Sequence, residues 1–284
     1  MPPVRSRSER SPSTPALLLA AIACTLLVLT GCSRSPGTGA ALARDSSRPA
    51  PSPGRSSYTI MQMNLCLSGI ADCYVKVAYP AALQEAAALI REARPDAVTI
   101  SEACRGDVAQ IARQTGYHLR FSTVIYGGRP FRCVQPGGRG VFGDSVLTKA
   151  AIVSSHNHAF TAQTDKERRR WLCASTVGQI EVCTAHLDTR SAVEAPGNDA
   201  QCAELAAILA RRSAAHTVIF GGDVNRRTTC APAGFWTRND TSADQAPGLQ
   251  QVYGSGGLRS PSARVVPFTH SDHDVLIVRA ARRR

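Results

Sequence analysis

The sequence lacks several features that would assign it to common protein classes. Its longest apolar run, residues 16–29, is too short to cross a bilayer as a helix, which needs about 20 residues. No Cys-x-x-Cys pair occurs among its ten cysteines, which argues against a structural zinc site. Aromatic residues are few, with seven Phe, two Trp and six Tyr, and no internal repeat is visible. With these classes disfavoured, we interpret the chain as a globular domain preceded by an amino-terminal segment of different composition.

The amino-terminal segment has the composition of an export signal. Basic residues precede the apolar run 16–29, which ends in Leu-Thr-Gly-Cys at Cys32. This ending resembles a bacterial lipobox, so we expect residues 1–31 to be a lipoprotein signal peptide and Cys32 to carry the lipid. A plain secretory signal with a chance cysteine is the alternative. Residues 32–57 are rich in Ser, Pro, Gly and Arg, which predicts a flexible tether. The protein would then be exported and held at the outer face of the cytoplasmic membrane, or secreted if the lipobox is not used.

The net charge of +12 is concentrated at the two ends of the chain. Between residues 58 and 281, 23 Lys and Arg stand against 19 Asp and Glu, and residues 282–284 form a basic tail of three arginines. Basic tails attract any polyanion and also anionic lipid headgroups. The net charge alone is therefore weak support for a nucleic-acid partner.

Eight cysteines fall within the predicted domain 58–281. An even number in an exported domain predicts four disulfides, and eight cysteines allow 105 connectivities. Cys173 and Cys183 lie symmetrically about Gly178 in an expected hairpin, which predicts that they pair. Cys66 and Cys73 would close a short loop. The remaining pairs would then follow by elimination: Cys104–Cys133 and Cys202–Cys230.

The pattern of apolar residues predicts alternating strands and helices. Strands are expected at 58–65, 97–101, 117–126, 141–149, 150–154, 218–221 and 274–280, with a hairpin over 171–187. Helices are expected at 81–93, 107–115 and 199–212, and residues 127–140 and 228–268 are expected to be irregular. Because some strand pairs are hairpins and others enclose helices, the pattern favours α/β layers with mixed sheets.

Five short segments place Asn, Glu, Asp or His at or near the ends of predicted strands. They are Met63-Asn64-Leu65, Ser101-Glu102, Thr184-Ala185-His186-Leu187, Gly222-Asp223-Val224-Asn225 and Ser271-Asp272-His273. Within the fourth, Gly221 and Gly222 are expected to break a buried strand, and Asp223 and Asn225 would share one face if the chain stayed extended. Such residues suit a polar site at the edge of a rigid sheet.

The order of these segments resembles the endonuclease/exonuclease/phosphatase superfamily, the DNase I-like fold, over nearly all of residues 58–281. The resemblance implies a four-layer α/β sandwich of two packed mixed β-sheets flanked by helices, with the site at one end. It also implies cleavage of phosphate esters with a divalent cation, usually Mg²⁺, with Mn²⁺ or Ca²⁺ as alternatives.

The chemistry of the residue types agrees with this resemblance. Hard cations prefer carboxylate and carbonyl oxygens, so Glu102, Asn64 and Asp272 are the expected metal ligands. Asp223 would orient or deprotonate the attacking water, while Asn225 would hold a phosphate oxygen or fix Asp223.

The two histidines of the pattern can each donate a hydrogen bond to a phosphate oxygen or carry a proton near pH 7. By resemblance, His186 stabilises or protonates the leaving side and His273 lies beside the nucleophile. Asn64, Asn225 and His186 are also expected to bind substrate. Asp272 would ligate metal or orient a histidine.

Three neighbouring features receive weaker interpretations. Asp188 could share the face of His186. The charge run 165–170 is interpreted as a solvated turn. Asp144 occupies a place where the family commonly has Asn, and its charge would repel phosphate unless a metal or Arg139 offsets it.

The sequence therefore predicts a metal-dependent hydrolase of phosphodiesters, most simply a nuclease acting outside the cytoplasm. A phospholipid or sphingomyelin phosphodiesterase, or a phosphatase for small esters, is the alternative enzyme, although few aromatic residues are available for a lipid-binding loop. A non-catalytic binding lipoprotein is less favoured, because loss of chemistry should first remove Glu102, Asp223 or His273. No protein partner can be inferred.

Overall fold

The computed structural model describes residues 57–70, 73, 79–163, 166–191 and 195–283. The described residues all belong to one compact unit. The predicted signal peptide, Cys32 and the tether up to residue 56 lie outside the described residues, and they stay predictions. Among the residues described, no helix is both long and apolar enough to cross a membrane.

The first sheet carries the amino- and carboxyl-terminal strands of the domain side by side. Its strands are β1 (Ser57–Asn64), β2 (Ala97–Cys104), β3 (His118–Thr123), β6 (Phe142–Thr148), β14 (Leu258–Val266) and β15 (Val275–Arg282). They are ordered β14-β15-β1-β2-β6-β3, and only β1 and β2 run parallel to each other. Arg282, predicted to open a basic tail, is the last residue of β15, and its guanidinium lies 5.3 Å from the centre of the Tyr58 ring.

The second sheet is built from the middle of the chain. Its strands are β7 (Ile152–Ala159), β9 (Arg170–Thr176), β10 (Ile180–Ala185), β11 (Thr217–Asp223), β12 (Trp236–Asn239) and β13 (Gln250–Gly254). They are ordered β12-β13-β11-β10-β9-β7, with β10 and β11 parallel and the other pairs antiparallel. A small third sheet joins β4 (Ile125–Tyr126), β5 (Arg129–Pro130) and β8 (Glu167–Arg168).

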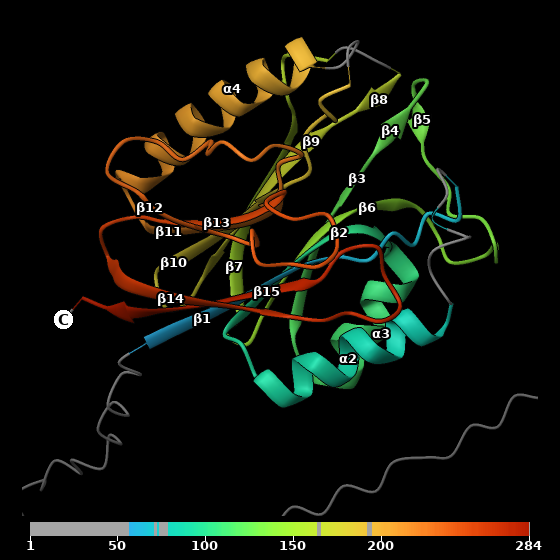
Figure 1. The fold of residues 1–284 in the computed structure, drawn as a ribbon, viewed down its shortest axis with the longest axis horizontal. Helices are drawn as coiled ribbons and strands as arrows, with labels where there is room; N and C mark the ends of the chain where they lie inside the picture. The colour runs from blue at the N-terminus through green and yellow to red at the C-terminus, as the bar shows by residue number, and fades with distance from the viewer. Residues whose placement is uncertain (1–56, 71–72, 74–78, 164–165, 192–194, 284) are drawn as a thin grey trace, which may run out of the picture. The chain divides into compact units, whose positions relative to one another are not determined.

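Three helices cover the outer faces of the two large sheets (Figure 1). They are α2 (Ala81–Ala93), α3 (Arg105–Thr115) and α4 (Ala195–Ser213). In α2, burial of Leu83, Ala87 and Ile90 gives the spacing of one helical face, and Arg94 ends the helix in a left-handed conformation before Pro95.

Three separate apolar clusters show that the sandwich has four layers. One cluster packs α2 and α3 against the first sheet, and another packs α4 against the second sheet. The third lies between the sheets and includes Ile60, Val146, Val182, Ile219 and Leu276. The predicted four-layer α/β sandwich with mixed sheets is confirmed.

The glycine pair in β11 allows the close approach of neighbouring strands. A Cβ at Gly221 would lie 2.4 Å from Thr99 Oγ1 in the other sheet, and one at Gly222 would lie 2.3 Å from the Ala185 carbonyl oxygen. The expectation that these glycines break the strand is wrong, because β11 continues through both to Asp223. Both positions require glycine because a side chain there would collide with a neighbouring strand.

The expectation of an irregular segment over 228–268 is also wrong, because β12, β13 and β14 all lie there. Gln250 and Gln251 interrupt the apolar pattern of β13, yet both are buried. Their amides are satisfied by Asp240 Oδ2 at 3.2 Å and by the Arg226 carbonyl oxygen at 2.7 Å. Strand β14 lies at a sheet edge, where polar residues are tolerated.

All eight cysteines of the domain form disulfides, as predicted. The structure contains the expected Cys173–Cys183 pair, and also Cys66–Cys73, Cys104–Cys133 and Cys202–Cys230. Cys173 and Cys183 are directly opposite each other in the β9–β10 hairpin.

Candidate active site

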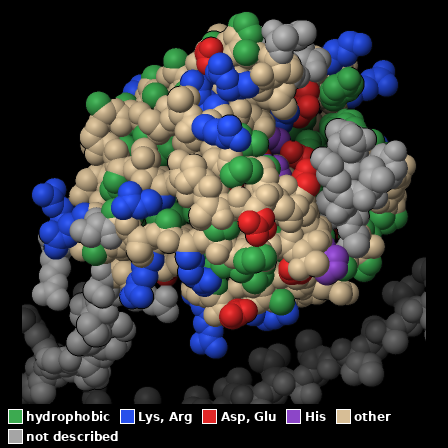
Figure 2. Space-filling view, viewed as in Figure 1, with side chains coloured by type: hydrophobic (Ala, Val, Ile, Leu, Met, Phe, Trp, Pro, Cys, Tyr) green, Lys and Arg blue, Asp and Glu red, His purple; other side chains and the backbone are tan. Residues whose placement is uncertain are grey.

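The five polar segments meet at one end of the sandwich, where β1, β2 and β11 end and the chain leaves β10. Because β1 pairs parallel with β2, and β10 with β11, the carboxyl ends within each pair lie together. Figure 2 shows acidic and histidine side chains together in one depression of the face drawn, with Lys and Arg side chains distributed around it. The site is therefore shared by two sheets.

Asn64 links the two sheets at the centre of this site. Its Nδ2 donates hydrogen bonds to Glu102 Oε1 and Asp223 Oδ2, both at 3.0 Å, and its Oδ1 accepts from the backbone N–H of Cys66 at 3.0 Å. Asn64 is 1% exposed. Since its oxygen faces the Cys66 amide, this geometry favours Asn64 as a bridge between carboxylates over its predicted role as a metal ligand.

A kink in β2 directs Glu102 into the site. The register of β2 against β6 shifts between Ile100 and Ala103, and Glu102 has a φ of 55°. Such a bulge re-aims a side chain at a sheet end. Burial raises the pKa of Glu102 to about 7, opposed by its hydrogen bond with Asn64 and assisted by the negative charges of Asp223 and Asp272. A bound cation would relieve this cost of burying the charge.

Asp223 is held in the ionised state by its neighbours. Burial alone would raise its pKa, but the nearby His273, whose Nε2 lies 3.6 Å from Asp223 Oδ2, and hydrogen bonds from Asn64 and the Asn225 backbone N–H bring the pKa below its usual value. His186 is also near, but it is neutral, as described below.

The backbone conformation that places Asn225 in the site differs from the predicted extended one. Its φ of 52° shows that the chain turns after Asp223 and does not stay extended. The turn brings the Asn225 N–H to Asp223 Oδ1 at 3.0 Å and its Nδ2 to the Leu187 carbonyl oxygen at 2.9 Å. Asn225 therefore lies beside Asp223 because of a left-handed turn.

His186 is fixed by a buried arginine that the sequence interpretation missed. Arg169 Nη1 lies 2.9 Å from His186 Nδ1, and the Arg169 side chain also contacts Glu167 at 3.2 Å and Asp188 at 3.4 Å. A guanidinium can only donate, so Nδ1 accepts and the ring proton lies on Nε2. Burial, with the positive charge of Arg169, lowers the pKa of His186 to about 3. His186 is therefore a neutral hydrogen-bond donor.

The Nε2 atom of His186 faces the middle of the site. It lies 3.7 Å from Glu102 Oε1 and 3.9 Å from Asp223 Oδ2, two oxygens that can accept its proton, and 2.9 Å from Asn225 Nδ2, which is also a donor and so forms no hydrogen bond with the protonated Nε2. His186 thus joins the Glu102 side of the site to the Asn225 side.

The loop before β15 completes the group. The Ser271 hydroxyl donates to the Asn64 carbonyl oxygen at 2.7 Å, which ties this loop to the end of β1. His273 is nearly buried and faces Asp223, while Asp272 lines the same hollow as Glu102. All seven predicted site residues in the described part of the chain, other than the cysteines, therefore converge.

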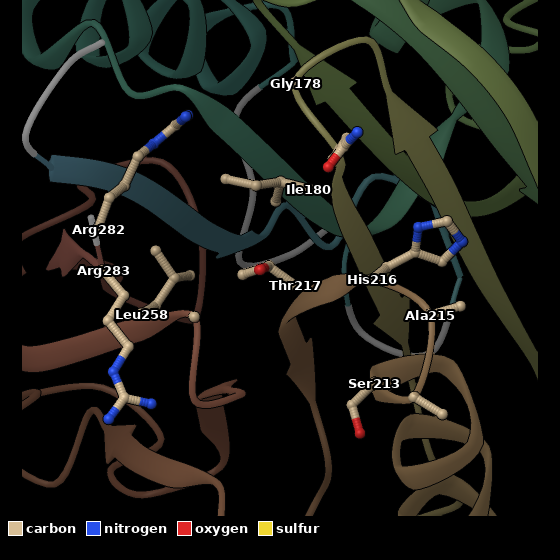
Figure 3. A pocket seen from close by; sticks show the side chains of 12 residues that line it. Gly178, Ile180, Ser213, Ala215, His216, Thr217, Leu258, Arg282 and Arg283 are labelled. Carbon is tan, nitrogen blue, oxygen red and sulfur yellow. The ribbon is translucent and has the colours of Figure 1, made fainter.

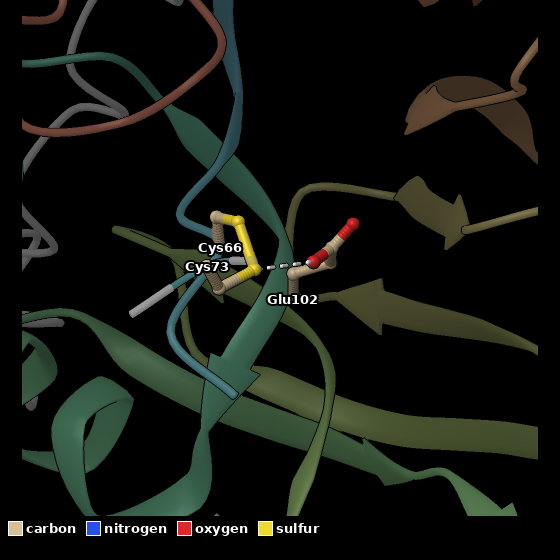
Figure 4. A group of neighbouring side chains, drawn as sticks. All are labelled: Cys66, Cys73 and Glu102. Carbon is tan, nitrogen blue, oxygen red and sulfur yellow. Dashed lines mark hydrogen bonds between the residues drawn. A yellow bond between two sulfur atoms is a disulfide. The ribbon is translucent and has the colours of Figure 1, made fainter. Parts of the chain in front are cut away.

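The donor set on the Glu102 side suits a hard divalent cation. Glu102 and Asp272 offer carboxylate oxygens in one hollow, and Mg²⁺ commonly binds to one or two carboxylates and several waters. The Cys66–Cys73 disulfide lies against this carboxylate, with Cys73 Sγ 3.6 Å from Glu102 Oε2 (Figure 4). Disulfide sulfur atoms are not thiolates, so they do not turn the site into a soft-metal site.

The hollow beside Glu102 also contains aromatic side chains. It has a volume of about 450 Å³, and its lining includes Tyr126, Phe131 and Phe142. Tyr126 and Phe131 stack with ring centres 5.3 Å apart, and Phe142 meets Phe131 edge to face at 5.5 Å. We call this the aromatic hollow. These three rings are five and eleven residues apart in the sequence, and they meet because the chain folds back on itself between residues 124 and 142.

A second hollow of about 420 Å³ lies at the opposite ends of the strands (Figure 3). It is lined by the starts of β10, β11 and β14, through Ile180, Thr217 and Leu258, and by Arg282 at the end of β15. It contains none of the predicted site residues.

Two of the weaker interpretations require correction. The charge run 165–170 is not wholly a solvated turn, because Arg169 is 7% exposed and contacts His186. Arg139 does not offset Asp144, because it forms a buried ion pair with Asp107 at 2.6 Å. Burial raises the pKa of Asp144 to about 7, opposed mainly by the positive charge of Arg169. Asp188, left open by the sequence, helps to hold Arg169.

Comparison with known proteins agrees with the fold. The profile of the Endonuclease/Exonuclease/phosphatase family matches residues 73–273. The human Nocturnin catalytic domain with bound sulfate anion superposes with a TM-score of 0.62 and 16% identity, covering 80% of this chain and 94% of that chain. An endonuclease/exonuclease/phosphatase from Beutenbergia cavernae gives 0.60 and 18%, covering 80% and 72%.

A third solved structure contains nucleic acid. It is D. rerio TDP2 complexed with single strand DNA product, with a TM-score of 0.55 and 14% identity over 79% of this chain and 99% of that chain. Identities this low show a shared fold alone. No curated protein sequence matches the chain significantly.

Proposed function

The chain belongs to the endonuclease/exonuclease/phosphatase family, a family of phosphoester-cleaving enzymes, and from that premise we propose that it hydrolyses phosphodiester bonds of nucleic acid by metal-assisted attack of water. The observation that carries the proposal is the Asn64 bridge, which holds Glu102 and Asp223 each 3.0 Å from one amide nitrogen. One carboxylate is thus available to a cation while the other stays ionised beside it.

The environment of each site residue suits it to one part of the hydrolysis reaction. Ionised Asp223 orients the attacking water and accepts its proton. His186 donates its Nε2 proton in a hydrogen bond to a non-bridging phosphate oxygen, and Asn225 and His273 donate to the same group. His186 does not act as the general acid, because Arg169 and burial keep it neutral.

Glu102 and Asp272 would hold the divalent cation in this reaction. When bound, Mg²⁺ would neutralise phosphate charge and stabilise the developing negative charge. Asn64 donates a hydrogen bond to one oxygen of Glu102 and to one oxygen of Asp223, so it holds the two carboxylates side by side while each keeps its own role.

A group of arginine side chains beside Asn225 supports nucleic acid as the substrate. Arg190, Arg226 and Arg227 line a hollow of about 440 Å³ together with Asn225, and we call it the arginine hollow. Asp199 contacts both Arg190 and Arg226, so three positive charges and one negative charge leave a net charge of +2 there. Backbone phosphates beyond the scissile one are bound by such groups. The DNA product in D. rerio TDP2 is consistent with this assignment.

We further propose that the enzyme acts outside the cytoplasm, anchored through Cys32 or secreted. The four disulfides of the domain support this location, because disulfides persist in oxidising compartments.

A substrate panel tests the proposed function. Purified protein with Mg²⁺ is offered plasmid DNA, RNA, sphingomyelin and bis(4-nitrophenyl) phosphate, with and without excess EDTA. We expect DNA or RNA to be cut, and EDTA to stop cleavage. Exposed Asp244 provides a matched control, because Asp244→Asn should retain activity. Cleavage of sphingomyelin without cleavage of either nucleic acid would reject the nuclease assignment, and full activity in EDTA would reject the metal.

A further inference from the structure

Two hollows of opposite character flank the reactive centre. The aromatic hollow contains Glu102, and the arginine hollow contains Asn225. His186 Nε2 lies 3.7 Å from Glu102 Oε1 and 2.9 Å from Asn225 Nδ2, so the two hollows open on either side of one imidazole. The adjacent residues Thr189 and Arg190 line the aromatic and the arginine hollow, respectively.

The aromatic hollow suits a flat uncharged group. Tyr126 is 44% exposed, which is unusual for a large apolar side chain in this domain, and it stacks on Phe131. Exposed rings bind nucleobases by stacking, whichever base is present. A volume of about 450 Å³ lies within the usual range for small-molecule pockets.

The charges around the aromatic hollow disfavour a second phosphate there. Among the described residues, Glu102, Glu167 and Asp272 line it, and the one lining cation, Arg169, is already engaged by Glu167 and Asp188. With the divalent cation bound at Glu102 and Asp272, these charges sum to about zero, so the hollow offers a second phosphate no net positive charge. The arginine hollow, by contrast, is net positive, and its Arg190 and Arg227 are exposed to solvent.

We propose that the enzyme binds a nucleic-acid strand with a fixed polarity, in which the base on one side of the scissile phosphate stacks on Tyr126 in the aromatic hollow and the next phosphate on the other side occupies the arginine hollow. This inference rests on the proposed function and extends it to the orientation of the substrate. It also assigns two specificity residues, Tyr126 and Arg227, that do not touch the reacting atoms.

An oligonucleotide with one missing base tests the polarity. The full-length protein cuts a single-stranded decamer in which one central nucleotide is replaced by tetrahydrofuran, and every cleavage position is quantified. An abasic residue has a phosphate on each side. We expect cleavage to fall about tenfold at one of these two phosphates and to stay normal at the other, since one stacked base contributes about that factor.

Variants at Tyr126 connect this asymmetry to the aromatic hollow. Tyr126→Leu should remove the difference between the two phosphates, whereas Tyr126→Phe should preserve it. Val177 is 63% exposed in the β9–β10 turn, and Val177→Ala serves as the matched control. Thermal unfolding checks that each variant is folded, and the unmodified enzyme tests the polarity even if a variant is not.

Variants that remove one arginine charge test the arginine hollow. Arg227→Gln should lower the slope of log affinity against log salt by about one, and Arg264→Gln on the exposed face of β14 should leave it unchanged. Equal cleavage at both phosphates of the abasic residue would overturn the polarity while normal cleavage elsewhere in the decamer upholds the nuclease function. Absence of cleavage at every phosphate with Mg²⁺, Mn²⁺ and Ca²⁺ would instead reject the nuclease function itself, and the polarity with it.

Discussion

The two sheets bring different chemistry to the same site. The first sheet supplies Asn64 and Glu102, and the loop before its last strand supplies Asp272 and His273. The second sheet supplies Asp223 and, just beyond its strands, His186 and Asn225. The carboxylates on the two sides share one Asn64 amide, yet burial raises the pKa of Glu102 while that of Asp223 is lowered.

The difference between the two carboxylates arises from their partners. Asp223 accepts hydrogen bonds on both oxygens, from Asn64 and from the Asn225 backbone, and these stabilise its charge. Glu102 accepts one such bond from Asn64, and its other oxygen meets a disulfide sulfur. We infer that the first sheet provides the place for a cation and the second provides the base. Substitutions on the two sides should therefore have separable effects on turnover and on the response to Mg²⁺.

Removing the charge of Asp223 should have the largest effect. Asp223→Asn is expected to lower kcat by about 10²–10⁴-fold, the usual contribution of a general base, while the response to Mg²⁺ remains. Steady-state kinetics and Mg²⁺-dependent thermal unfolding would measure both. Turnover equal to that of Asp244→Asn would remove Asp223 from the mechanism.

Glu102→Gln should abolish the Mg²⁺ response. In the unaltered protein, Mg²⁺ should raise Tm because it binds only the folded state, and this rise should vanish in the variant. The rise should also shrink as pH falls from 8 to 6. With a pKa of about 7, Glu102 is increasingly protonated over that range, so a cation must displace a proton. A rise in Tm that persists unchanged in the variant would assign the cation elsewhere.

Arg169→Gln should have a smaller effect, confined to the second sheet's side. Without the guanidinium, the His186 ring can take either neutral tautomer, and its pKa should rise from about 3 because a positive charge is removed. We expect kcat to fall about tenfold, with the Mg²⁺-induced shift of Tm preserved. The ¹⁵N chemical shifts of His186 report the tautomer directly, and an unchanged tautomer would contradict this role.

The disulfides offer the mildest comparison between the two sides. Replacing Cys66 and Cys73 by Ser should lower activity several-fold, because the Cys66 N–H fixes Asn64 and Cys73 touches Glu102. Replacing Cys202 and Cys230, which join α4 to the loop after β11, should lower the free energy of unfolding by about 2–4 kcal/mol and leave kcat at 25 °C unchanged. Similar losses of activity in both double variants would show that the first bridge has no special relation to the site.

Residue pattern and the family resemblance together were enough to predict the layers, the helices and most of the site. Residues 81–93 have helical periodicity and form α2 with those bounds, because local spacing and the stop at Pro95 suffice. The polar residues at strand ends converge because parallel strands bring their carboxyl ends together. A strand interrupted by buried glutamines, such as β13, could not be predicted, because distant partners satisfy those amides.

The contacts that each polar group makes could not be predicted in the same way, because they depend on how the sheets pack. Arg169 lies in a charged stretch typical of a surface turn. The pairing of β9 with β10 buries its side chain against His186. The rings Tyr126, Phe131 and Phe142 likewise meet only because the chain between residues 124 and 142 folds back on itself. Residue type and spacing fix which chemistry a chain can perform. Protonation states and substrate-binding surfaces depend on burial and on contacts between distant segments, so they are set when the two sheets pack.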